Sequence, residues 1–72
     1  MFILYTQMSE SKDVEILKIG TKEECVKAAQ DRFNYSRYCG RLSIEEIEEE
    51  LDRDTLSDFN SEEYEQYKLR EV

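Results

Sequence analysis

The sequence predicts one small α+β domain, in which a three-stranded antiparallel sheet carries two helices on one face in the order β-β-α-α-β. Three observations predict it. The chain has 72 residues, enough for a single domain with a thin core. Its first twenty residues contain two runs rich in strand-forming side chains, and two capping boxes follow, each of which predicts a helix. We therefore expect residues 1–72 to fold as one domain.

Residues 2–8 and 14–19 are the two strands of an expected hairpin. The first run is rich in β-branched and aromatic residues, and in the second Val14, Ile16 and Lys18 are expected on one face. The polar segment 9–13 between them has the length of a hairpin connection.

A first helix is expected after Gly20. Thr21 and Glu24 fit a capping box, in which each side chain hydrogen-bonds the backbone amide of the other residue. The apolar positions of this helix share one face, and Asn34 or Gly40 can end it. These positions are Cys25, Val26, Ala29 and Phe33.

A second helix is expected after Ser43, because Ser43 and Glu46 repeat the capping-box pattern. Ile44, Ile47 and Leu51 form its apolar stripe, and its other positions are acidic.

The C-terminal third allows two interpretations. Residues 52–60 show no periodicity and are expected to form a loop. In segment 63–72, Tyr67 and Leu69 alternate with polar residues as in a strand, whereas Tyr64 and Lys68 have the spacing of a helix face. We favour the strand, because a hairpin alone is only marginally stable and a third strand completes the sheet. The alternative fold ends in a third helix.

The composition excludes several kinds of chemistry. The chain has no histidine, which excludes a Ser-His-Asp triad, a Cys-His dyad and a His-ligated metal. Its carboxylates lie on a solvated segment without the apolar pocket that would separate their pKa values. We predict a protein that is not an enzyme and has neither cofactor nor metal. A calcium loop over residues 52–63 is a weaker alternative, because Leu56 and Ser57 occupy positions that need a ligand and a glycine.

The cysteines and the apolar segments indicate a cytoplasmic protein. Cys25 and Cys39 are not spaced as a CxxC pair, so two reduced thiols are expected, with Cys25 half-buried on its helix and a disulfide as the alternative. The apolar N-terminus lacks a basic leader, and no apolar run approaches the ~18 residues of a membrane span.

Negative charge is concentrated in one segment. The chain has 10 basic and 18 acidic side chains, a net charge of −8, which disfavours direct binding to nucleic acid or to anionic membranes. Residues 1–44 have a net charge of +1, whereas residues 45–65 contain eleven acids and one base. Like charges four residues apart destabilise a helix, and acids near its C-terminus oppose the helix dipole. A local rule broken without evident compensation suggests a functional reason.

The acidic segment has the character of a nucleic-acid mimic. Helix neighbours three or four residues apart stand about 5–6 Å from each other, so a row of carboxylates can imitate a row of phosphates before a basic groove. The alternative is a solvated acidic face that keeps a small protein soluble. The candidate partner-binding residues are Glu45, Glu46, Glu48, Glu49, Glu50, Asp52, Asp54, Asp58, Glu62 and Glu63.

In size, charge and the clustered run 45–50, the chain resembles small acidic phage-encoded inhibitors of the anti-CRISPR and anti-restriction type. The resemblance implies a protein that blocks a basic, nucleic-acid-binding protein or complex by occupying its channel. It implies no individual residue roles, because that class shares no sequence motif.

Two functions from different classes are therefore expected. The first is a non-enzymatic inhibitor that binds a nucleic-acid-processing protein through its acidic helix and loop. The alternative is a regulatory or structural adaptor that forms a homodimer and binds a protein partner through a sheet edge or tyrosines. Of the tyrosines, Tyr67 is expected to complete the core, while Tyr35 and Tyr38 suit an interface equally well.

Overall fold

Strands and helices follow one another in the order β-β-α-α-β-β. The computed structural model describes residues 1–35, 37–60 and 63–72. The elements are β1 (Phe2–Met8), β2 (Val14–Gly20), α1 (Lys22–Asn34), α2 (Ile44–Asp52), β3 (Ser57–Asn60) and β4 (Glu63–Glu71). The predicted α+β class is confirmed, and so are the expected hairpin, the two helices and the C-terminal strand.

The sheet has four strands, in the order β2-β1-β4-β3, and all neighbouring pairs are antiparallel. The prediction of three strands was wrong because segment 57–60, expected to be a loop, forms β3. That segment has no strand pattern of its own, and its extended form comes from pairing with β4, where Phe59 lies opposite Tyr64. β4 also pairs with β1 along its length, which excludes the alternative of a third helix.

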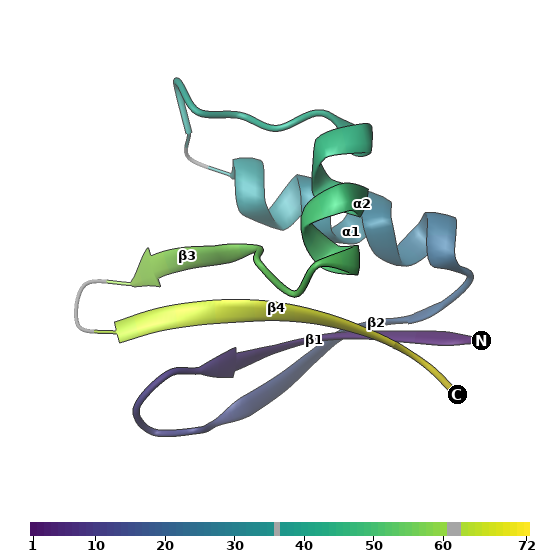
Figure 1. Ribbon diagram of the computed structural model, residues 1–72, viewed down its shortest axis with the longest axis horizontal. Coiled ribbons are helices and arrows are strands. Elements are labelled where there is room, and N and C mark those ends of the chain that lie inside the picture. The colour runs from purple at the N-terminus through teal and green to yellow at the C-terminus, as the bar shows by residue number, and fades with distance from the viewer. Residues whose placement is uncertain (36, 61–62) are drawn as a thin grey trace.

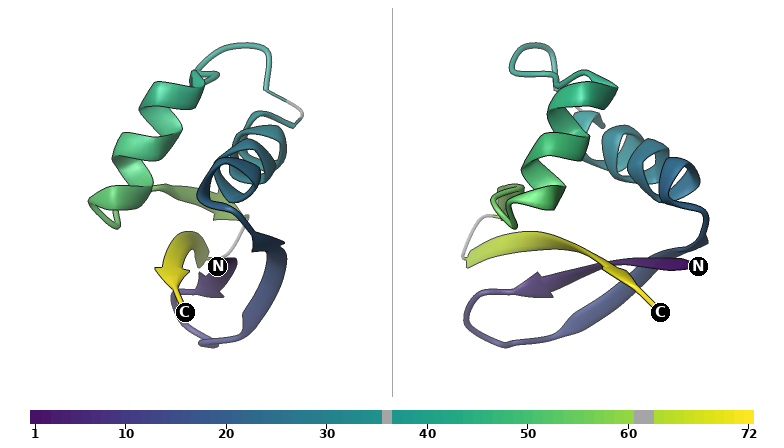
Figure 2. Two further views of the ribbon diagram at one scale, coloured as in Figure 1. Left: turned by 90° about the vertical axis from the view of Figure 1, so that its right-hand side faces the viewer. Right: turned by 45° about the vertical axis from the view of Figure 1, so that its right-hand side comes forward.

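Both helices lie on the same face of the sheet, as expected (Figure 1, Figure 2). The core fills the space between the helical layer and the sheet, and each of β1, α1, α2 and β4 contributes to it. Its buried apolar residues are Leu4, Cys25, Val26, Ala29, Phe33, Ile47, Leu51, Leu56 and Tyr67.

Both predicted capping boxes are present. The Thr21 hydroxyl accepts from the Glu24 amide at 3.1 Å, and the Glu24 carboxylate accepts from the Thr21 amide at 2.9 Å. Ser43 and Glu46 repeat the arrangement at 3.3 and 3.0 Å. These reciprocal bonds satisfy two amides that a helix start otherwise leaves without partners.

Helix α1 ends at Asn34, the first of the two predicted ends, and the buried Asn34 side chain binds the connection that leads to α2. Its amide nitrogen donates to the Leu42 carbonyl at 2.9 Å, and its oxygen accepts from the Leu42 amide at 3.0 Å. These two hydrogen bonds hold Leu42 against the end of α1, directly before the residue that caps α2.

Three details differ from the sequence prediction. The β1–β2 register shifts between Leu4 and Tyr5, so Lys18 lies opposite the buried Leu4 and leaves the face of Val14 and Ile16. Cys25, expected to be half-buried, is fully buried because α1 presses it against the backbone of β1 and β2. Ile44, expected in the apolar stripe of α2, is not buried with Ile47 and Leu51 but is partly exposed.

Candidate protein-binding surface

Helix α2 packs against the rest of the protein with one side and exposes carboxylates on the other. Ile47 and Leu51 are buried against α1 and β4. Glu45, Glu49 and Asp52, spaced by four and three residues, share the opposite side of the helix and are exposed. We call Glu45, Glu46, Glu48, Glu49, Glu50 and Asp52 together the α2 acidic face. α2 occupies an outer border of the helical layer, so this face is accessible (Figure 2).

A lysine from the other helix compensates part of the expected repulsion. The Lys22 ammonium lies 3.6 Å from Glu48 and 3.4 Å from Asp52, which are four residues apart on α2. The hydrogen bond and attraction of Asp52 raise the pKa of Lys22 above its usual value. Lys22 thus reduces the repulsion between Glu48 and Asp52, for which the sequence alone indicates no compensating cation.

The other carboxylates of the α2 acidic face differ in what they contact. Glu46 closes the capping box, Glu49 pairs with Arg53 at 2.7 Å, and Glu50 accepts from the Thr55 hydroxyl. Glu45 makes no ion pair within residues 1–35, 37–60 and 63–72. Glu45 and Glu49 are therefore the two positions of this face whose side chains bind neither a capping amide, nor Thr55, nor the other helix.

The acids that follow α2 do not extend this face as one row. Asp54, at a positive φ of 57°, binds the Arg70 guanidinium at 3.0 Å, and that hydrogen bond holds the pKa of Asp54 below its usual value. Asp58 pairs with Arg37 at 2.6 Å. Each carboxylate already has a cation of the same chain beside it.

Glu63 lies at the other end of the molecule, against the β1–β2 connection. Its carboxylate accepts from the amides of Glu10 and Ser11 at 2.9 and 3.1 Å. Partial burial alone would raise the pKa of Glu63, but these amides outweigh it and lower the pKa. Glu62 lies outside the described residues. Of the described candidate residues, the structure therefore gathers the six on α2 into one surface.

That surface keeps its negative charge after internal pairing is counted. The α2 acidic face has six carboxylates, and Lys22 and Arg53 are the two cations of the described residues that pair with them. The resulting net charge of −4 attracts a cationic surface and repels an anionic one.

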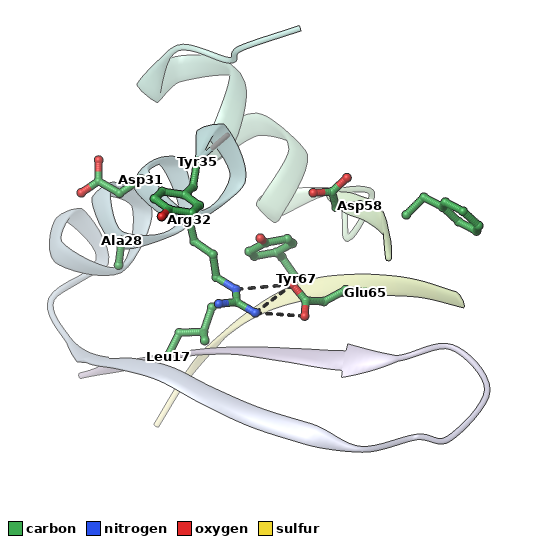
Figure 3. A pocket seen from close by; sticks show the side chains of 9 residues that line it. Leu17, Ala28, Asp31, Arg32, Tyr35, Asp58, Glu65 and Tyr67 are labelled. Carbon is green, nitrogen blue, oxygen red and sulfur yellow. Dashed lines mark hydrogen bonds and ion pairs between the residues drawn. The ribbon is translucent and has the colours of Figure 1, made fainter. Parts of the chain in front are cut away.

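An open groove of about 680 Å³ lies between α1 and the sheet (Figure 3). The Arg32 guanidinium crosses it and binds both oxygens of Glu65, at 3.0 and 3.2 Å. The hydrogen bond with Glu65 raises the pKa of Arg32. The other charged residues that line the groove are also paired, Asp31 with Lys27 and Asp58 with Arg37. Among the described residues, the groove therefore presents no unpaired charged group that would select a ligand.

The tyrosines divide between core and surface. Tyr67 is buried and packs edge-to-face on Phe33 with ring centroids 6.1 Å apart, as expected for a core residue. Tyr35 and Tyr38 are exposed at and beyond the end of α1, and Tyr64 is exposed beside Phe59.

Both cysteines are free thiols, Cys25 buried and Cys39 exposed. In the part of the chain that the structure describes, no three His, Cys, Asp or Glu side chains gather as a metal site requires. No helix among those residues has both the length and the apolar character that crossing a membrane demands.

A scan against protein-family models finds no match to this chain. Searches of curated proteins and of solved structures find none either. Function must therefore be argued from the geometry described above.

Proposed function

We propose that this chain is a small cytoplasmic inhibitor that binds a nucleic-acid-processing protein, of the kind found in CRISPR or restriction systems. It acts by binding, with no chemistry of its own. The α2 acidic face occupies the basic surface that would otherwise hold DNA or RNA.

The observation that carries the proposal is the retained charge of the α2 acidic face. Three exposed carboxylates, Glu45, Glu49 and Asp52, run along one side of a helix about 5–6 Å apart. Phosphates along one strand of a duplex rise by about 3.4 Å and stand farther apart through space. A groove lined with Lys and Arg to hold phosphates can therefore receive this row, with fast and salt-sensitive association.

The contact is centred on α2 rather than on the whole acidic segment. Asp54, Asp58 and Glu63 are bound to Arg70, to Arg37 and to backbone amides. A partner would have to compete with these internal bonds, as it also would with Arg53 at Glu49 and with Lys22 at Asp52. The α2 acidic face still contributes more to binding, because its six carboxylates face only the two cations Lys22 and Arg53 among the described residues.

The test is affinity capture from a cell extract of proteins that bind nucleic acid. The tagged chain should retain a basic protein at low salt and release it at about 1 M salt, where the Debye length is ~3 Å. The double variant Glu45→Lys/Glu49→Lys should lose that protein. Glu46 and Glu50 are left unchanged, because they bond the helix start and Thr55.

The matched control is Glu10→Lys/Asp13→Lys. It makes the same change of charge at two exposed residues of the β1–β2 connection, far from α2 (Figure 1). Equal loss of capture in both double variants would mean that only net charge matters. Capture that survives Glu45→Lys/Glu49→Lys would refute the role of α2.

A further inference from the structure

The sheet has a second face, which no helix covers (Figure 2). Leu4 and Thr6 of β1 are buried toward the helices, so strand alternation places Ile3 and Tyr5 on the opposite side. The register then adds Ile19, opposite Ile3, and Ile16, opposite Tyr5, on the neighbouring β2. We call this side of the sheet, with Ile3, Tyr5, Gln7, Val14, Ile16, Ile19, Tyr64, Gln66, Lys68 and Arg70, the open face.

The part of the open face on β2 is apolar where a solvated sheet face is ordinarily polar. Val14, Ile16 and Ile19 of β2 are between 51% and 59% exposed. At the other border, the exposed Tyr64 packs edge-to-face on Phe59, with ring centroids 5.3 Å apart. Apolar side chains thus stand on both edge strands, and Gln66, Lys68 and Arg70 of β4 lie between them.

Acidic side chains avoid the open face. All five acids of the described strands have the alternation or register of the helix-covered side: Glu15 lies opposite the buried Thr6, and Asp58 opposite Glu65. Glu63, Glu65 and Glu71 share the side of the buried Tyr67. In a chain with 18 acids, this placement keeps negatively charged side chains of the described strands away from one surface.

We propose that the open face is the interface of a homodimer, in which a second copy packs on it sheet against sheet. A second copy fits a face that is free of acids among the described strands. Two chains of net charge −8 repel each other through most of their surfaces, and a contact at the open face keeps both sets of acids on the outside, where this repulsion is smallest. The cations of the face do not oppose the contact, because Arg70 is neutralised by Asp54 and a lysine such as Lys68 can extend its ammonium to the rim.

The available area fits a small dimer. With strands about 4.8 Å apart and residues about 3.4 Å apart, the 7, 7, 4 and 9 residues of β1, β2, β3 and β4 cover roughly 440 Å². Two copies then bury roughly 900 Å² in flat projection. The accessible area is larger because side chains stand out from the sheet, so the interface falls near the lower end of stable ones, about 1,200 Å².

The edges of the sheet are less suited to pairing with a second copy. β2 carries the register shift beside Leu4 and Tyr5, and β3 is only four residues long. Bulges and short edge strands both oppose the addition of another strand. Face-to-face packing is therefore favoured over a continuous intermolecular sheet.

Sedimentation velocity from micromolar to millimolar concentration tests the proposal. The wild-type chain should approach twice its mass of 8.7 kDa as concentration rises. Ile16→Glu should raise the dimer dissociation constant at least about 100-fold, because each interface would bury the new charge twice. The matched control is Tyr38→Glu, which places an acid on a fully exposed residue outside the open face and should leave the constant within about threefold.

Circular dichroism shows whether each variant is folded, and Val14→Glu carries the same test should Ile16→Glu fail to fold. A wild-type chain that stays monomeric up to millimolar concentration overturns the proposal. So does a dimer that persists in Ile16→Glu or Val14→Glu, or one that Tyr38→Glu dissociates. Loss of the dimer in the open-face variants alone supports it.

Discussion

Truncation of Leu51 to alanine tests whether α2 is held in place by its buried stripe. Leu51 is 2% exposed and lies with Ile47 beneath the α2 acidic face. A nine-residue helix is too short to be stable alone, so its position depends on this packing. Leu51→Ala removes three buried carbons and leaves a cavity, which costs about 2–5 kcal/mol in comparable cores.

We expect a loss of about 3 kcal/mol in the free energy of unfolding. A chain of 72 residues has a total of roughly 4–11 kcal/mol, so this one change removes a large part of it. Urea unfolding followed by circular dichroism measures the loss, and the midpoint should fall while the slope stays constant.

The control is Ile44→Ala on the same helix. It also removes three carbons, but Ile44 is already 39% exposed and leaves no closed cavity, so the loss should be about half as large, roughly 1.5 kcal/mol. If the two variants lose the same amount, or if Leu51→Ala loses less than about 1 kcal/mol, α2 is not packed as described here.

Three further predictions concern thiols and pH. A thiol reagent should modify the exposed Cys39 at once and the buried Cys25 only as the chain unfolds; two equally fast thiols would contradict the packing of α1. Arg70 lowers the pKa of Asp54 from its usual 3.8, so this pair stabilises the fold above that pH and the contribution disappears as pH falls below it. Asp54→Asn tolerates the same positive φ and should lower stability by a few tenths of a kcal/mol at pH 7 and by less at pH 3, as urea midpoints at both pH values will show. Burial raises the pKa of Tyr67 from 10.0 to about 12, so the folded state holds that proton and loses stability as pH rises through this window. Tyr67→Phe should make the decline between pH 10 and 12 shallower in thermal unfolding, and an unchanged slope would show that Tyr67 does not titrate there.

Local signals in the sequence predicted most of the fold. The two capping boxes need only residues three apart, and the hairpin needs only a polar connection between two strand-like runs. β3 could not be found this way, because Ser57, Asp58, Phe59 and Asn60 show no alternation. Its strand is imposed by β4, which also joins β1 some sixty residues away in the chain.

The acidic segment was visible in the sequence, but its internal partners were not. Arg37 precedes Asp58 by 21 residues, and Glu10 precedes Glu63 by 53 residues. Lys22 reaches Asp52 from the other helix. These pairs follow from tertiary packing, and they explain why the structure separates the α2 acidic face from the acids that follow it. The open face was equally hidden, because the register shift in β2 decides which side chains share it.

The proposed inhibition requires that the α2 acidic face compete with nucleic acid for one basic surface. Once a partner has been captured, it can be loaded with a fluorescent oligonucleotide and titrated with this chain. Fluorescence anisotropy should fall to the value of free oligonucleotide, and Glu45→Lys/Glu49→Lys should need at least about tenfold more protein for the same displacement. An oligonucleotide that stays bound while the chain joins the complex, seen as a rise in anisotropy, would contradict the claim.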